Sequence, residues 1–122
     1  MKLPQDKTPY PRDPRSISLS AHLSDGLYVF VQDNQGIVHL LPDGPHMHPK
    51  VLGGAEPAMY AGDLMVNNGR VADLTNLSGT FQFDDEAGLR AVAAQISLQG
   101  LVVNQGAVRL FPLDGSVPIV LQ

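Results

Sequence analysis

The chain has 122 residues, of which 43% are apolar, and a formal net charge of −4 at pH 7. This length is enough for one domain with its own hydrophobic core, and the absence of cysteine excludes disulfide bonds and thiolate chemistry. No stretch approaches the roughly 20 apolar residues of a membrane helix, and the first residues lack the apolar segment of a secretory signal, so we expect a cytoplasmic protein.

Charge is distributed unevenly along the chain. Residues 1–15 contain four of the eight lysines and arginines together with two aspartates, a net charge of +2. The remaining residues carry four cations against ten carboxylates, a net charge of −6. Binding to nucleic acid or anionic lipid relies on clustered cations. We therefore expect neither nucleic acid nor a membrane as a partner, and favour another protein, such as a basic toxin or enzyme.

The N-terminal segment is rich in proline. Residues 1–16 contain four prolines, each of which fixes φ, removes an amide donor and biases the preceding residue to extended geometry. We predict an extended arm over residues 1–16, followed by a single β-rich domain over residues 17–122. Two interpretations of the arm stay open: a passive tail, or a segment that docks on a partner or across its own sheet.

Two β-hairpins are the clearest local signals in the sequence. Residues 27–41 contain two apolar runs separated by a turn at residues 33–36. Residues 60–66 and 70–75 flank an Asn-Asn-Gly turn, and an Asn-Gly pair accepts the positive φ angles of a type I′ turn. The second hairpin is only partly apolar, which predicts a sheet with one face in solvent.

Residues 84–99 form the predicted helix. Carboxylates at residues 84–86 complement the helix dipole at the N-terminus, and Gly100 occupies the position of a C-terminal capping glycine. An apolar stripe at helical spacing consists of Leu89, Val92, Ala93 and Ile96. Gly88 costs roughly 1 kcal/mol relative to alanine, so we expect a soft first turn.

Strands are predicted again at residues 107–111 and 117–121. Pro118 cannot donate to a β-ladder, which makes the last strand an edge strand. Together the elements predict an α+β, mainly β fold. We expect a twisted, mostly antiparallel sheet of five to seven strands with one packed helix at about residues 84–99.

The segment between the two hairpins is the most unusual. Residues 42–58 contain four prolines and three glycines, which predicts a long irregular loop. Within it, an extended His46-Met47-His48 would direct two imidazoles to the same side, where they could bind one metal ion. Further ligands could come from His39, Asp43 or Glu56. This spacing is similar to the His-x-His of cupins, without the second half of that motif. The alternative is that the histidines pack, bond to carbonyls or face solvent.

Short motifs between residues 27 and 111 follow one another in a recognisable order. They are His48, Val51-Leu52-Gly53-Gly54, Ala61-Gly62-Asp63-Leu64, Asn68-Gly69, Ser78-Gly79-Thr80-Phe81 and, after the helix, Gly100-Leu101. In this order the chain resembles a small bacterial domain with a Ser-Gly-His-Tyr box, which also occurs in plant calmodulin-binding IQ-motif proteins. The resemblance covers about two thirds of the chain and implies a fold more than a function.

The chain departs from that pattern in two ways. Thr80-Phe81 stands where the box has His-Tyr, so a role of that histidine does not carry over. The chain also lacks an IQ motif, so calmodulin binding does not carry over either.

The sequence contains no convincing active site. There is no Gly-x-Ser-x-Gly elbow, and Ser78 has no base beside it in sequence. Gly53-Gly54 lacks the remaining residues of a phosphate-binding or dinucleotide-binding loop. The carboxylates at residues 84–86 are explained by helix capping. We therefore expect no cofactor and favour a protein that is not an enzyme.

The expected function is a non-catalytic protein-interaction module. It would be an inhibitor of the immunity or antitoxin type, or an accessory subunit of a larger bacterial assembly. The predicted partner-binding residues lie in the arm, the 42–58 segment and the last strand; they are Pro9, Tyr10, Pro11, Glu56, Val117 and Ile119. The last strand also offers an edge for a homo-oligomer.

Two alternatives to this function stay open. One is a metal-binding protein or metal-dependent enzyme that uses His46 and His48. The other is a small-ligand sensor built around residues 42–58.

Overall fold

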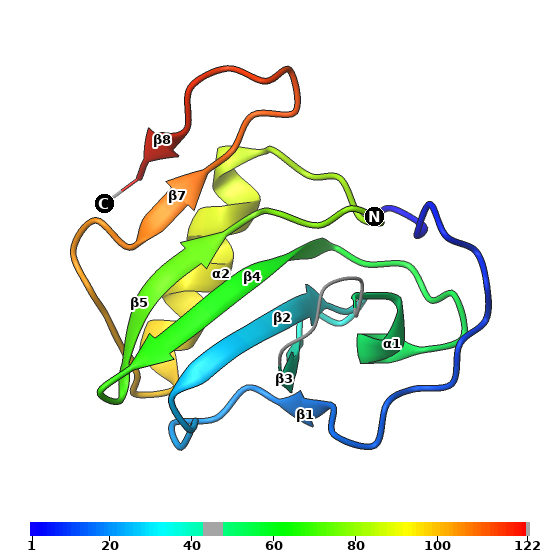
Figure 1. Ribbon diagram of the computed structural model, residues 1–122, viewed down its shortest axis with the longest axis horizontal. Coiled ribbons are helices and arrows are strands. Elements are labelled where there is room, and N and C mark those ends of the chain that lie inside the picture. The colour runs from blue at the N-terminus through cyan, green and yellow to red at the C-terminus, as the bar shows by residue number, and fades with distance from the viewer. Residues whose placement is uncertain (43–47, 122) are drawn as a thin grey trace.

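A computed structural model describes residues 1–42 and 48–121. Within these residues the chain forms eight strands of one open sheet and two helices (Figure 1). The strands are β1 (Ile17–Ser18), β2 (Gly26–Gln32), β3 (Val38–Pro42), β4 (Tyr60–Asn67), β5 (Arg70–Thr75), β6 (Val102–Val103), β7 (Val108–Leu110) and β8 (Ile119–Val120). The helices are α1 (His48–Leu52) and α2 (Glu86–Leu98).

The sheet is mostly antiparallel, which confirms the predicted fold class. Its strand order is β1-β3-β2-β4-β5-β7-β8, with β6 pairing beside β7 on β5. The pairings of β5 with β6 and β7 are parallel, and parallel neighbours need a crossover connection, which α2 provides. The described strands exceed the predicted five to seven because the two-residue strands β1 and β6 carry no local signal.

Both predicted hairpins are present. β2 pairs with β3, and β4 pairs with β5 through the Asn-Gly turn. Asn68 and Gly69 have φ angles of 54° and 72°, the positive values that a type I′ turn requires. The carboxylate of Asp25 accepts hydrogen bonds from both backbone amides, at 2.9 and 3.0 Å. This turn is therefore held to the start of β2.

The helix α2 packs on one face of the sheet, behind β4 and β5 in Figure 1. Its predicted apolar stripe is buried: Leu89, Val92, Ala93 and Ile96. Asp85 is the N-cap and accepts a hydrogen bond from the backbone amide of Gly88 at 3.0 Å. Asp84 instead accepts from the amide of Leu113 at 3.0 Å, which ties the start of α2 to the C-terminal segment.

The helix α1 lies inside the segment that the sequence predicts to be irregular, so that prediction is wrong for residues 48–52. Pro49 is compatible with the first turn of a helix, because amides there have no intrahelical partner. Val51 is fully buried against the sheet. The remaining part of the predicted metal motif, residues 43–47, lies outside the described residues.

The last strand β8 pairs only with β7 in the described part of the chain, so it is an edge strand as Pro118 predicts. Apolar side chains in and before this strand are exposed: Val120 in β8 by 60%, and Val117 before it by 82%. In the described residues, no helix is both long enough and apolar enough to cross a membrane.

Candidate functional site

A hollow of about 850 Å³ opens where the N-terminal arm, α1, the sheet and the loop after β5 meet. We call it the arm pocket. The arm contributes Gln5, Asp6 and Tyr10, and the loop contributes residues 77–80. The sheet and α1 contribute Val29, Asp63, His48 and Pro49. Four segments that are distant in sequence therefore build one pocket.

His48 is the buried histidine of this pocket. It is the first residue of α1, and its Nε2 lies 2.8 Å from the carbonyl oxygen of Gly62. A carbonyl oxygen only accepts hydrogen bonds, so Nε2 carries the hydrogen and donates it. Burial lowers the pKa of His48 below its usual value of 6.5, and the bond to Gly62 only partly opposes this. The ring is therefore neutral at pH 7, with its lone pair on Nδ1.

Asp63 is the carboxylate beside this histidine. Its Oδ1 lies 3.6 Å from Nε2 of His48, and its side chain is 45% exposed. Burial, and then the negative charge of Asp73, raise the pKa of Asp63 to about 6. Among the described residues, no lysine or arginine lies within ion-pair distance of Asp63. At pH 7 this carboxylate is mostly ionised, and residues 1–42 and 48–121 place no full positive charge beside it.

The position of Asp63 depends on the glycine before it. A β-carbon at Gly62 would collide with the backbone of Thr75 and lie 2.8 Å from the ring of Phe30. Because glycine has no β-carbon, the backbone of β4 at this position fits between the ring of Phe30 and the backbone of β5. The same residue supplies the carbonyl that holds His48.

The loop after β5 is hydrogen-bonded to the arm at Gln5 and Asp6. The hydroxyl of Thr80 accepts a hydrogen bond from the amide of Asp6 at 3.0 Å, and its carbonyl accepts from the amide of Gln5 at 2.8 Å. The hydroxyl of Ser78 accepts from the amide of Phe81 at 3.1 Å, which closes the loop on itself. One wall of the arm pocket is therefore a hydrogen-bonded contact between two loops.

The middle of the arm is held by α1 and the two glycines that follow it. The amide of Asp13 donates to the carbonyl of Lys50 at 2.9 Å, and the amide of Gly54 donates to the carbonyl of Tyr10 at 2.7 Å. Gly53 has a φ angle of +75°, and a β-carbon there would lie 2.8 Å from the α-carbon of Arg12. The glycine pair therefore permits close contact between two backbones.

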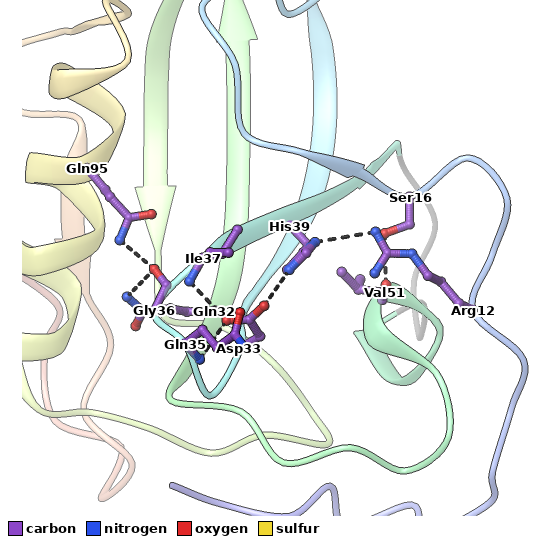
Figure 2. A network of polar contacts seen from close by, with 10 residues as sticks. All are labelled: Arg12, Ser16, Gln32, Asp33, Gln35, Gly36, Ile37, His39, Val51 and Gln95. Atoms are coloured by element: carbon purple, nitrogen blue, oxygen red, sulfur yellow. Dashed lines mark hydrogen bonds and ion pairs between the residues drawn. The ribbon is translucent and has the colours of Figure 1, made fainter.

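A polar network extends this anchoring into the sheet (Figure 2). Arg12 always donates, so its contact of 3.3 Å with Nδ1 of His39 makes that nitrogen an acceptor. Nε2 of His39 then donates to Asp33 at 2.7 Å. The other carboxylate oxygen of Asp33 accepts hydrogen bonds from the backbone amides of Gln35 and Ile37. These two hydrogen bonds close the turn between β2 and β3. The arm is thus connected through one histidine to the first hairpin.

The structure separates the predicted metal ligands. His48 lines the arm pocket, whereas His39 is engaged with Arg12 and Asp33, and Glu56 is exposed away from the pocket. His46 and Asp43 lie outside the described residues. The described part of the chain contains no group of three His, Asp or Glu side chains that would hold a metal ion. A site that includes His46 stays a prediction.

Five of the six predicted partner-binding residues fall into two separate regions, and the sixth, Glu56, is exposed on the segment after α1. Tyr10 lines the arm pocket, and its hydroxyl donates to Asp6 at 2.9 Å, while Pro9 and Pro11 on either side are exposed. Val117 and Ile119 lie at the β8 edge, at the opposite end of the strand order from β1.

Sequence reasoning assigned no role to Asp63 or Asp6. Asp63 stands within the Ala61-Gly62-Asp63-Leu64 motif noted in the sequence, and this was the signal that could have identified it. Comparison of the chain with models of protein families, with curated proteins and with solved structures gives no match. Functional proposals therefore depend on the geometry and charge of the chain's own residues.

Proposed function

We propose that this protein is a ligand-binding module and that its ligand occupies the arm pocket. The convergence of four sequence-distant segments on one hollow of about 850 Å³ carries this proposal. A volume of this size lies within the range of known small-molecule sites. Three of the short motifs noted in the sequence, at His48 and at residues 61–64 and 78–81, contribute to the walls.

The side chains of the pocket support binding over catalysis. Nε2 of His48 donates to a backbone carbonyl, and in the described residues no hydroxyl or amine is hydrogen-bonded to this ring. The hydroxyl of Ser78 accepts a backbone amide. A nucleophile needs a base within hydrogen-bond reach, and neither group has that relationship here. The pocket instead offers polar groups around an apolar wall of Val29 and Leu77.

The proposal can be tested at Gly79, which lines the pocket and has open space around it. A β-carbon at this position would meet no atom within 4 Å. Gly79→Phe should therefore fold and place a bulky ring at the wall of the pocket, whereas Gly79→Ala should leave the pocket open. Ligands found by thermal-shift screening should raise the melting temperature of the wild type and of Gly79→Ala, because they bind only the native state. The same ligands should leave Gly79→Phe unchanged. Equal binding to all three proteins would contradict the proposal.

A second candidate function, protein interaction through the β8 edge, is favoured by a separate observation. The free edge of β8 is flanked by exposed apolar side chains, with Val117 82% and Ile119 49% exposed. Such an edge accepts an added strand. The partner would be a basic protein that an immunity-type inhibitor covers, a larger assembly that takes this chain as an accessory subunit, or a second copy of the chain.

This candidate is tested by adding charge to the edge. Ile119→Lys and Val120→Lys keep the strand exposed but make strand addition unfavourable. We expect a partner to co-purify with the wild type from its native host and to bind it as a purified pair. Recognition through the edge is supported if this partner binds neither variant. Light scattering on the same three proteins tests the homo-oligomer. Unchanged partner binding by both variants argues against the edge.

A further inference from the structure

Asp63 stands at the junction of two hollows. The first is the arm pocket, and the second, of about 230 Å³, lies on the sheet beside it. The two hollows share the side chains of Val29, Asp63 and Leu77. A ligand in the arm pocket that extends along the sheet therefore passes this carboxylate.

The two carboxylates near this junction differ in whether a cation is paired with them. Asp73 lines the second hollow and is satisfied by Arg109, which makes two hydrogen bonds to its two oxygens at 2.8 Å each. Asp63 has no such partner among the described residues. The arm pocket itself is lined by Asp6 and Asp63, and no lysine or arginine is among its lining residues in the described chain.

Apolar side chains contribute to the walls of both hollows that meet at Asp63. Leu77 is 43% exposed, and Leu27 in the second hollow is 54% exposed. Exposed leucines beside a carboxylate suit a ligand that has an apolar body and a cationic end. An anionic ligand would instead approach two carboxylates and a neutral imidazole. Two cations near this region have other partners: Arg109 in the second hollow pairs with Asp73, and Lys50 lies over the ring of Tyr10 at 5.5 Å from its centre.

We propose that the arm pocket binds the ammonium or guanidinium end of an aliphatic chain, with Asp63 receiving the charge and Val29 and Leu77 packing against the chain. This inference rests on the proposed function, because it specifies the ligand of the same pocket. The same chemistry occurs in free amines, such as diaminopentane and agmatine, and in a lysine or arginine side chain of a partner protein. Asp63→Asn keeps the shape of the side chain and removes its charge, so it isolates the proposed contact.

The experiment titrates the full-length protein with four small probes and two peptides. The probes are diaminopentane, agmatine, pentanol and pentanoate; the peptides are blocked tripeptides with a central lysine or arginine. Backbone amide shifts of residues 77–80 report binding in the pocket. The matched control is Glu56→Gln, which removes one negative charge at an exposed position outside the pocket.

Binding of the cationic probes with a loss of about tenfold or more in Asp63→Asn supports the proposal, since a hydrogen bond to a charged group contributes that much. Glu56→Gln should change affinity less than about twofold, because exposed charges are screened. Tighter binding of the peptides than of agmatine identifies a partner's side chain as the source, and the reverse order identifies a free amine.

Other outcomes overturn the inference. Pentanol or pentanoate binding as tightly as diaminopentane would show that charge does not select the ligand, as would equal affinities of Asp63→Asn and Glu56→Gln. In both cases the pocket still binds, so the proposed function stands. If no compound of any charge class, in these titrations or in the wider screen, shifts the amides of residues 77–80, the proposed function itself fails.

Discussion

Oδ1 of Asp63 lies 3.6 Å from Nε2 of His48, yet the hydrogen on that nitrogen is donated to the carbonyl of Gly62 at 2.8 Å. The burial that lowers the pKa of His48 also contributes to raising that of Asp63 to about 6. At neutral pH the two side chains are therefore a neutral ring and a carboxylate, and not an ion pair. Asp63 keeps a charge that no other described residue neutralises, which is a property often found at functional sites.

Replacing that carboxylate should stabilise the protein at neutral and alkaline pH. The pKa of Asp63 rises from 3.8 to about 6 on folding, so its contribution to stability is present below pH 3.8 and is lost as the pH rises through about 6. The full shift corresponds to about 3 kcal/mol. Because the side chain is 45% exposed, screening reduces the expected gain of Asp63→Asn to on the order of 1 kcal/mol.

Urea unfolding of wild type, Asp63→Asn and Glu56→Gln at pH 8 and pH 4 measures this gain. Asp63→Asn should be more stable than wild type at pH 8 and should lose that advantage at pH 4. Glu56→Gln reports the general effect of removing one negative charge. A variant less stable than wild type at pH 8 would show that Asp63 is a structural residue.

Gly88→Ala should destabilise the protein, although alanine is the better helix former by roughly 1 kcal/mol. A β-carbon at residue 88 would lie 2.5 Å from Cε1 of Tyr60, whose ring is fully buried and stacks on Phe83 at 5.0 Å. Overpacking of this kind costs about 1–3 kcal/mol, and the better helix propensity of alanine offsets roughly 1 kcal/mol of it, so we expect a net loss of up to about 2 kcal/mol.

A double-mutant cycle with Tyr60→Leu checks the cause of this loss. In the Tyr60→Leu background the ring is absent, so Gly88→Ala should cost less than it does in the wild type. An equal cost in both backgrounds would place the effect in the helix itself and not in the contact between residues 60 and 88.

Elements defined by local signals were predictable from the sequence. The stripe from Leu89 to Ile96 and the turn at Asn68-Gly69 each encode their structure within a few residues, and both are confirmed. The edge position of β8 followed from one property of Pro118, its missing amide hydrogen. These are cases in which the chemistry of a residue restricts its own backbone.

Features that depend on distant contacts were not predictable. The helix α1 is only five residues long and depends on the burial of Val51, which a local pattern cannot reveal. Gly88 looked like a weakness of the helix, whereas the structure explains it by the ring of Tyr60. The arm pocket combines residues 5–10 with residues 77–80, and no sequence pattern relates two such segments.

Gly53→Ala should release the arm from α1. Its β-carbon would lie 2.8 Å from the α-carbon of Arg12, and a backbone cannot move aside as a flexible side chain can. Gly54→Ala is the matched control, because Gly54 also has a positive φ angle, of +63°, but a β-carbon there would meet only the side chain of Glu56, at 3.9 Å. Both variants carry similar backbone strain, of order 1 kcal/mol. A difference in their behaviour therefore reports the loss of contact between Gly53 and the arm.

Tryptic cleavage after Arg12 and hydrogen exchange at the amide of Asp13 measure this release. Both should accelerate more in Gly53→Ala than in Gly54→Ala, since the amide of Asp13 donates to Lys50 only while the arm is docked. Equal rates in the two variants would indicate that the arm is held independently of the contact with Gly53.

His48→Ala should destabilise the protein and alter its response to acid. The substitution leaves the buried carbonyl of Gly62 without its donor, which costs about 1–3 kcal/mol. Because the pKa of His48 is lowered on folding, its contribution is present above pH 6.5 and is lost as the pH falls through that value towards the lower folded pKa. The wild type should therefore lose stability between pH 7 and pH 5 more steeply than His48→Ala.

The exposed His22 supplies the control for this measurement, because His22→Ala removes a histidine without disturbing a buried hydrogen bond.

Zinc titration of the same proteins, with His46→Ala added, tests the two-histidine metal site. Nδ1 of His48 is free to bind a metal ion while Nε2 donates to Gly62, but the described residues contain no group of three His, Asp or Glu side chains that could complete a site, so we expect no stoichiometric zinc. Stoichiometric zinc that is lost in both His46→Ala and His48→Ala would instead assign residues 46–48 to a metal site and make the arm pocket its access route.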